Sequence, residues 1–284
     1  MKTYNLKFIT PAFLCGANQS NAELRAPSVR GALRWWFRVL GGTREEEAHV
    51  FGGVHGGAQK SKVVVRCEVR EMGTQPFPEP TDPRSESNLY YLGYFAKALN
   101  DKKTGERKPS RFSAGANIPM GTVFEIQIGA SGLEPQLQQK LDQAIDFFVH
   151  LGSLGLRATR GFGAFAEEKE EKLPTRSEFA QWVKGNAADT KVMVRLTNDE
   201  VYSDAKKAMS ALGGWLRAIR KETHCDGKQE SAFGYSKGRE RMSSALKLRP
   251  VQVKEGFLPV GVYTDEACSR GSQAEAVERA SVAL

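Results

Sequence analysis

Apolar residues at helical spacing predict one strongly amphipathic segment early in the chain, over residues 25–42. Four apolar side chains fall on one stripe at the pitch of an α-helix, with Phe37 at its edge: Val29, Leu33, Trp36 and Leu40. Pro27 suits the first turn, and the pair Gly41-Gly42 is a usual stop signal. The pattern therefore predicts a helix that packs one face against the rest of the protein.

The other apolar patterns predict strands and helices in a similar order in the two halves of the chain. In the first half, we expect strands at 4–9, 62–69 and 122–128 and a helix over 134–151, followed by a glycine-rich turn and a last strand. In the second half, we expect a strand at 191–196, a helix over 201–221, a hairpin of 246–253 and 257–263, and a short final helix at 274–284.

These elements predict an α+β fold with two ferredoxin-like, RNA-recognition-like modules. An N-terminal ferredoxin-like domain with the glycine-rich loop spans 1–170, and a C-terminal ferredoxin-like domain spans 190–284. The second domain ends soon after its hairpin, which leaves its completeness open. Residues 213–220, Gly-Gly-Trp-Leu-Arg-Ala-Ile-Arg, weakly echo residues 31–38, Gly-Ala-Leu-Arg-Trp-Trp-Phe-Arg. Because each segment follows an opening strand, the echo supports a duplicated module.

A second stripe on the early helix carries positive charge. Arg30, Arg34 and Arg38 stand beside the apolar stripe, where their mutual repulsion favours an anionic partner. Gly31 on the same face would let a phosphate approach closely. The alternative is that these arginines pair with carboxylates of the chain or are solvated. Trp35 could stack on a base or cap the edge of the core.

The glycine-rich turn over residues 152–165 is a second candidate for phosphate contact. Gly155, Gly161 and Gly163 leave backbone amides accessible to an anion, and Arg157 and Arg160 add charge. The turn follows a helix and lacks a Lys-Ser or Lys-Thr pair, so it is not a nucleotide-binding fingerprint. A purely structural tight turn is the alternative, and the two arginines favour contact with an RNA backbone.

Further basic residues extend the predicted RNA-binding set. Arg111 lies in the basic loop 100–115, which either orders on nucleic acid or is simply solvated. Arg239 and Arg241 lie in the glycine-, serine- and charge-rich linker 223–245, and Arg25 precedes the amphipathic helix. We expect all four to contact RNA.

Composition narrows the choice of partners. The 284 residues carry a formal net charge of +8, which favours polyanions and nucleic acid above all. No apolar run approaches the ~20 residues needed to cross a bilayer, and the first residues lack the pattern of a secretory signal, so we expect a cytoplasmic location and no membrane partner. The four cysteines are widely spaced, and we expect neither a metal site nor a cofactor.

The sequence does not present a catalytic constellation. His49 or His55 could act as a general base in RNA cleavage, although ordinary surface histidines explain both positions. Asp82, Asp101 and Asp226 are isolated, whereas two-metal phosphodiester chemistry needs clustered acids. We therefore expect a non-catalytic RNA-binding subunit and not an enzyme. The alternatives are an endoribonuclease that processes guide RNA and a purely architectural subunit.

Four segments together carry a resemblance to a known family, at residues 10–17, 23–38, 51–53 and 61–63. They resemble the first-subunit family of the Cmr complex, the type III-B CRISPR effector, within the repeat-associated mysterious protein (RAMP) superfamily. The stretch 241–248 resembles the family's C-terminal strand entry. The turn 155–163 resembles the glycine-rich loop of the superfamily. The N-terminal match is specific to the subunit, and the loop only to the superfamily.

The resemblance implies two fused ferredoxin-like domains and no nuclease activity. It also implies a place in a ribonucleoprotein for antiviral defence, beside other Cmr subunits and near the 3′ end of the guide RNA, where the subunit helps to capture target RNA. In that family a neighbouring backbone subunit cleaves the target.

Overall fold

The computed structural model describes residues 1–18, 20–54, 58–74, 87–93, 99–100, 103–108, 117–222, 233–237, 240–242, 244–264 and 273–284. Within these ranges, only the backbone is described at 87, 99–100, 107–108, 235–237, 240–242 and 273–275.

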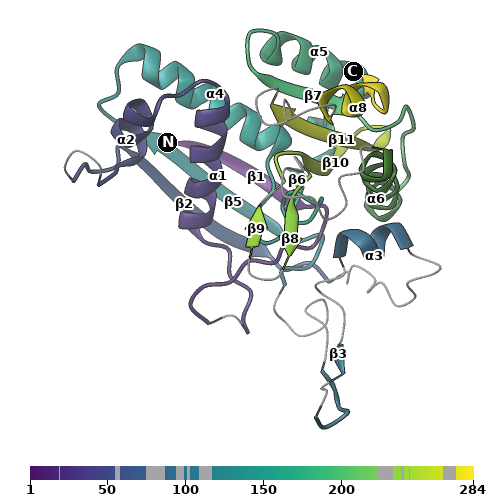
Figure 1. Cartoon of the computed structure of the whole chain (residues 1–284). Helices are drawn as coiled ribbons and strands as arrows, with labels where there is room; N and C mark the ends of the chain where they lie inside the picture. Colours follow the sequence, from purple (N-terminus) through teal and green to yellow (C-terminus); the bar gives the residue numbers. More distant parts are fainter. Residues whose placement is uncertain are drawn as a thin grey trace.

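The first sheet has antiparallel strands in the order β2-β5-β1-β6. In chain order these are β1 (Lys2–Phe8), β2 (Val63–Glu71), β5 (Val123–Ala130) and β6 (Phe165–Glu167). Helices α1 (Ala26–Val39) and α4 (Pro135–Leu151) pack against each other and against this sheet (Figure 1). Strand alternation explains the packing, because Leu6 and Phe8 are buried in the shared core while Lys7 between them is half-exposed.

Helix α1 forms where the apolar stripe predicts it. Pro27 lies in its first turn, and Val29, Leu33, Trp36 and Phe37 are buried. Gly41 follows the helix with a φ of 97°, a conformation that glycine adopts without strain.

The second sheet repeats the strand order of the first. Its antiparallel order is β10-β11-β7-β12, from β7 (Val192–Leu196), β10 (Lys247–Val253), β11 (Gly256–Thr264) and β12 (Val282–Ala283). Helices α6 (Ala205–Glu222) and α8 (Gln273–Arg279) complete the second half. In each sheet the order is therefore second, third, first and fourth strand. The final segment was expected to be wholly helical, but its last residues pair with β7, because β12 supplies the fourth strand of the sheet.

The remaining described elements connect these layers. They are α2 (Arg44–Phe51), α3 (Ser87–Gly93), β3 (Leu99–Asn100), β4 (Arg107–Lys108), the 3₁₀ turn η2 (Glu170–Lys172), α5 (Arg176–Ala187), β8 (Tyr235–Lys237) and β9 (Glu240–Met242). The sequence analysis did not predict α2 or α5. Each begins with a capping box, in which the Thr43 or Thr175 hydroxyl accepts from the amide three residues on. The segment expected to be a linker contains the β8–β9 hairpin.

One apolar core joins the two halves. It combines Phe124 and Phe148 of the first half with Val194, Val251 and Val260 of the second sheet. Helix α5 lies over one side of the second sheet, and α6 lies on the other (Figure 1). Among the described helices, none is long and apolar enough to cross a membrane.

Candidate nucleic-acid interface

One buried carboxylate lies between two arginines of α1. The Nε of Arg34 donates to Oε1 of Glu47 at 2.6 Å, and Nη1 of Arg38 lies 3.4 Å from Oε2 of the same group. Helix α2 positions Glu47, whose side chain is only 6% exposed, while the Arg38 side chain remains 54% exposed. The alternative of pairing within the chain is therefore partly correct. Two guanidinium groups nevertheless share one carboxylate, so a positive charge remains at this surface.

Arg30 takes a different position on the same face of α1. Its Nη2 donates to the carbonyl oxygen of Val63 at 3.5 Å, a weak contact with the first residue of β2. Its Nε is buried and has no hydrogen-bond partner among the described residues. Arg30 therefore lies against the edge of the sheet, and its buried Nε is one donor for which the described residues supply no acceptor.

A hollow of about 660 Å³, here called the α1–α2 hollow, opens beside these arginines. Its lining residues are Arg34, Arg38, Arg44, Glu45, Glu47, Ala48, Gly53 and Gln59. The backbones of Gly53 and Gln59 exchange two hydrogen bonds, of 3.2 and 2.8 Å, and fix one wall. Three arginines against two glutamates make the lining cationic, and exposed guanidinium groups suit bidentate phosphate contact.

Trp35 packs within the protein. The ammonium of Lys247, the first residue of β10, lies 3.4 Å from the centroid of the Trp35 ring. The ring also meets Trp36 edge to face at 4.8 Å between centroids. Burial lowers the pKa of Lys247 to about 8. Trp35 thus caps the core edge and holds a cation from the other half, a contact that no spacing in the sequence indicates.

The glycines of the predicted phosphate loop satisfy packing demands. Gly155, Gly161 and Gly163 all have positive φ, at 95°, 87° and 67°. A Cβ at Gly161 would collide with the sulfur of Met209 on α6, and one at Gly163 with the carbonyl of Leu154. Because Gly161 and Gly163 are buried, we assign them the structural role that the sequence analysis held as the alternative.

Arg160 lies inside the fold, contrary to its expected place on an RNA-binding surface. Its side chain donates to the Ser244 hydroxyl at 3.2 Å and to the carbonyl of Phe233, and the residue is 7% exposed. Phe162, two residues on, is fully buried in the core beneath α6. The glycine-rich loop therefore packs between the two halves of the chain. Because Arg160 and Phe162 are buried in this contact, they are not accessible to a ligand. Arg157, with a φ of 63°, is half-buried.

The remaining predicted contacts are dispersed. Arg25 precedes α1, and its Nε lies 3.8 Å from a carboxylate oxygen of Glu23. Arg111 and Arg239 lie outside the described residues, and Arg241 is described only by its backbone in β9. The loop and α1 approach each other at the start of β10, where the amide of Leu248 donates to Thr159 and the neighbouring Lys247 covers Trp35.

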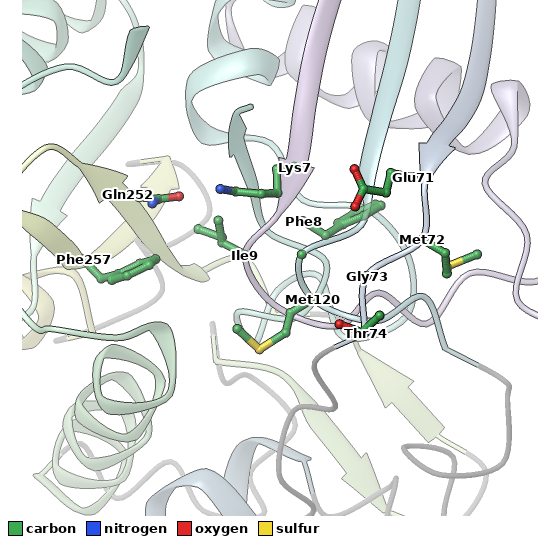
Figure 2. A pocket seen from close by; sticks show the side chains of 11 residues that line it. Lys7, Phe8, Ile9, Glu71, Met72, Gly73, Thr74, Met120, Gln252 and Phe257 are labelled. Carbon is green, nitrogen blue, oxygen red and sulfur yellow. The ribbon is translucent and has the colours of Figure 1, made fainter. Parts of the chain in front are cut away.

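A groove of about 330 Å³, which sequence reasoning did not indicate, lies where the two halves meet. Figure 2 shows Lys7 and Ile9 from the end of β1 between two groups of residues, Met72 beyond the end of β2 on one side and Phe257 of β11 on the other. Gln252 lines the same groove, and its buried Oε1 has no hydrogen-bond partner among the described residues. The groove mixes apolar and polar groups without a concentration of charge.

The described histidines are engaged by neighbours. The Nε2 of His49 lies 2.7 Å from the ammonium of Lys62, which can only donate and so occupies the lone pair that a general base would use. His150 stacks on Trp182, with 4.3 Å between ring centroids, and pairs with Asp146 at 3.4 Å. His55 lies outside the described residues. Among the residues that the structure describes, no group of three His, Cys, Asp or Glu could hold a metal ion.

Comparison with known proteins shows the superfamily to which the chain belongs. Residues 5–166 match the sequence model of the RAMP superfamily, and the chain belongs to this superfamily. Its curated relatives include the CRISPR system Cmr subunit Cmr1-2 of Pyrococcus furiosus, 27% identical over 177 residues that cover 57% of this chain and 91% of the relative. Cmr subunit Cmr1-1 of the same organism is 28% identical over 178 residues, 55% of this chain and 46% of the relative. The expected similarity to first Cmr subunits is confirmed.

Solved structures share the fold. The apo crystal structure of Cmr1 from Pyrococcus furiosus matches with a TM-score of 0.60 and 17% identity, over 92% of this chain and 87% of that one. A chain of the type III-B Cmr-beta complex bound to cognate target RNA, solved by cryo-EM, matches with a TM-score of 0.56 and 13% identity, over 97% and 99% of the two chains. The predicted α+β class, with antiparallel sheets, is therefore confirmed.

Proposed function

We propose that this chain is a non-catalytic RNA-binding subunit of a type III-B CRISPR (Cmr) ribonucleoprotein effector. In this role it contacts guide RNA near the 3′ end, helps to capture target RNA, and assembles with other Cmr subunits in the cytoplasm. The relatives that are Cmr subunits, and the similar fold found in a complex with cognate target RNA, support the assignment. The repeated strand order supports two ferredoxin-like domains, 1–170 and 190–284.

The observation that carries the proposal is the shared carboxylate beneath α1. Glu47 neutralises one charge of the Arg34 and Arg38 pair, and Arg44 adds another cation to the α1–α2 hollow. Phosphodiesters bind such a surface through charge and planar guanidinium contacts, with little dependence on sequence. Arg25 and Arg157 do not line this hollow and are proposed as separate RNA contacts, and the buried Arg160 is left out of the surface.

The structure dictates which arginines to replace. Removing Arg34 would leave Glu47 buried beside a more distant partner, so a loss of binding could reflect unfolding. Arg38 and Arg44 are exposed, and the double variant Arg38→Ala/Arg44→Ala leaves the Arg34–Glu47 pair intact. A matched control, Lys184→Ala/Lys254→Ala, removes the same charge from exposed positions on α5 and the β10–β11 turn.

Binding of single-stranded RNA should be titrated by fluorescence anisotropy at several salt concentrations. For the Arg38/Arg44 variant, we expect weaker binding and a decrease of about 1.4 in the slope of log K against log salt, at ~0.7 for each lost phosphate contact. The Lys184/Lys254 control should retain the wild-type slope. Equal slopes for the wild type and the Arg38/Arg44 variant would refute this RNA-binding surface.

The absence of catalysis needs a separate assay. We expect repeat-containing RNA to stay intact when incubated with the purified protein, with or without a chelator. Defined cuts that disappear in His49→Ala or His55→Ala would overturn the non-catalytic assignment and favour a guide-processing endoribonuclease.

A further inference from the structure

A second basic hollow lies where α3 meets α6. This α3–α6 hollow has a volume of about 400 Å³. Its lining residues are Asn88, Tyr91, Gly214, Arg217, Ala218, Arg220 and Lys221. Figure 1 shows α3 directly beside α6, on the right of the view, whereas α1 lies on the left.

Two glycines bring the helices together. Gly213 is buried, and a Cβ at this position would collide with the backbone carbonyl of Asn88. A Cβ at Gly214 would lie 2.9 Å from the Asn88 side-chain amide. This close approach leaves the next turn of α6 facing the end of α3. There Nη1 of Arg217 donates to Oδ1 of Asn88 at 3.1 Å, which fixes the guanidinium beside the hollow.

All the charged side chains that line the α3–α6 hollow are positive. Arg217, Arg220 and Lys221 supply three cations, and none of the described residues that line the hollow is acidic. The adjacent Glu222 accepts from Nη2 of Arg279 at 2.9 Å, so its carboxylate is already paired with α8. The α1–α2 hollow contains two glutamates, and the α3–α6 hollow is therefore the more uniformly cationic of the two.

An aromatic ring accompanies the cations. The Cζ of Arg217 lies 6.0 Å from the centroid of the half-buried Tyr91 ring. A guanidinium fixed beside an aromatic face can bind a phosphate while the ring stacks on the adjoining base, the combination by which proteins hold single-stranded nucleic acid. An acidic protein partner would use the charges but would have less need of the ring.

We propose that the α3–α6 hollow is a second binding site for single-stranded RNA, in which Arg217 and Lys221 contact phosphates and Tyr91 stacks on a base. The site rests on the proposed RNA-binding function and extends it to the second half of the chain. It also gives a role to the motif at residues 213–220, whose glycines shape the site and whose arginines charge it.

The test compares two double variants of one helix. Arg217→Ala/Lys221→Ala removes two cations from the hollow, and Lys206→Ala/Lys207→Ala removes two from the opposite end of α6. In anisotropy titrations of the full chain with uridine-rich single-stranded RNA, we expect the first variant to lose about 1.4 from the salt slope and the second to keep the wild-type slope. Tyr91→Leu should weaken binding about fivefold or more at constant salt.

Photocrosslinking locates the contact independently. RNA that contains 4-thiouridine should crosslink to the peptide that includes Tyr91, and the Arg217/Lys221 variant should lose that crosslink. Wild-type affinity and slope in the Arg217/Lys221 variant, together with no crosslink at Tyr91, would overturn the second site while leaving the α1–α2 hollow in place. Failure of the wild-type chain to bind RNA at all would instead overturn the proposed function.

Discussion

The guanidinium of Arg249 donates to the carbonyl oxygen of Phe165 at 2.8 Å, which ties the second sheet to the edge strand of the first. The same side chain donates to the carbonyl of Gly152 at 2.5 Å, where the glycine-rich loop begins. Arg249 is 2% exposed, so these carbonyls have little access to water. A buried cation therefore fixes the relative position of the two halves.

Replacing this cation should destabilise the whole chain. We expect Arg249→Met to lower the free energy of unfolding by at least about 2 kcal/mol, because buried carbonyls lose their donors. Urea denaturation followed by circular dichroism measures the effect, with Lys254→Met, an exposed residue of the next turn, as the control. An unchanged urea midpoint for Arg249→Met would show that the two halves do not depend on this contact.

The two arginines that share Glu47 should differ in their effect on stability. Arg34→Ala removes the closer partner, at 2.6 Å, of a buried carboxylate, and we expect a loss of about 1–3 kcal/mol. Arg38→Ala removes an exposed group at 3.4 Å and should cost less than about 1 kcal/mol. The second change Glu47→Gln should recover part of the Arg34→Ala loss. Equal losses of unfolding free energy in Arg34→Ala and Arg38→Ala would contradict the prediction that Glu47 depends mainly on Arg34.

Lys247 should make stability rise with pH under alkaline conditions. Burial against Trp35 lowers its pKa from the model-compound value of 10.5 to about 8, so between these values the unfolded chain binds more protons than the folded chain. Stability therefore increases as pH rises through this window, by about 1–3 kcal/mol. Lys247→Met should abolish this rise and be more stable than the wild type at neutral pH. If the unfolding free energies of the wild type and Lys247→Met changed in parallel with pH, the lowered pKa of Lys247 would be refuted.

The pair of His150 and Asp146 should stabilise the junction of α4 and α5 over an intermediate range of pH. Burial opposes the charge of His150, but the hydrogen bonds and charge of Asp146 outweigh it and raise the histidine pKa. Burial likewise opposes ionisation of Asp146, yet His150 and the Trp182 indole hold the aspartate pKa below its usual value. The histidine contribution is thus lost as pH rises through its raised pKa, and the aspartate contribution is lost as pH falls through its lowered pKa.

Asp146→Asn should remove both contributions, because the amide cannot pair with a charged imidazole. We expect the variant to lose more stability at pH 5.5 than at pH 9, because the charge contribution of His150 is lost as pH rises through its raised pKa. Thermal unfolding at the two pH values gives the comparison. The same loss at both values would mean that the indole hydrogen bond of 2.8 Å, and not the charge pair, carries the effect.

Periodicity predicted the layers of this protein better than it predicted the contacts between them. The helical stripe of Val29 and Leu33 and the alternation of β1 and β11 each depend on neighbours close in sequence, and all three elements formed where expected. Helix α2 was missed because its apolar signal is weak, although Thr43 and Glu46 form a readable capping box. The burial of Arg160 depends on Phe233 and Ser244, far along the chain, so no local pattern could reveal it.

The two basic hollows were also predicted only in part, because a local pattern does not show which distant residues meet it. The charged stripe of α1 was evident from spacing, whereas its partner Glu47 comes from a helix that the pattern did not show. At the other hollow, the echo of residues 213–220 was visible, but the approach of α3 to Gly213 was not. Tyr91 could be placed beside Arg217 only when the helices were seen together.

The continuous apolar core has a consequence for how the chain must be handled. Val194 and Val260 lie in the same apolar core as Phe124 and Phe148, so each half needs the other to bury its apolar side chains. Cleavage of the chain near residue 188 would expose a broad apolar surface on both fragments, and each fragment would be prone to aggregate. The two sheets share one strand order, yet they enclose a single apolar core, so the two halves cannot be separated without exposing it.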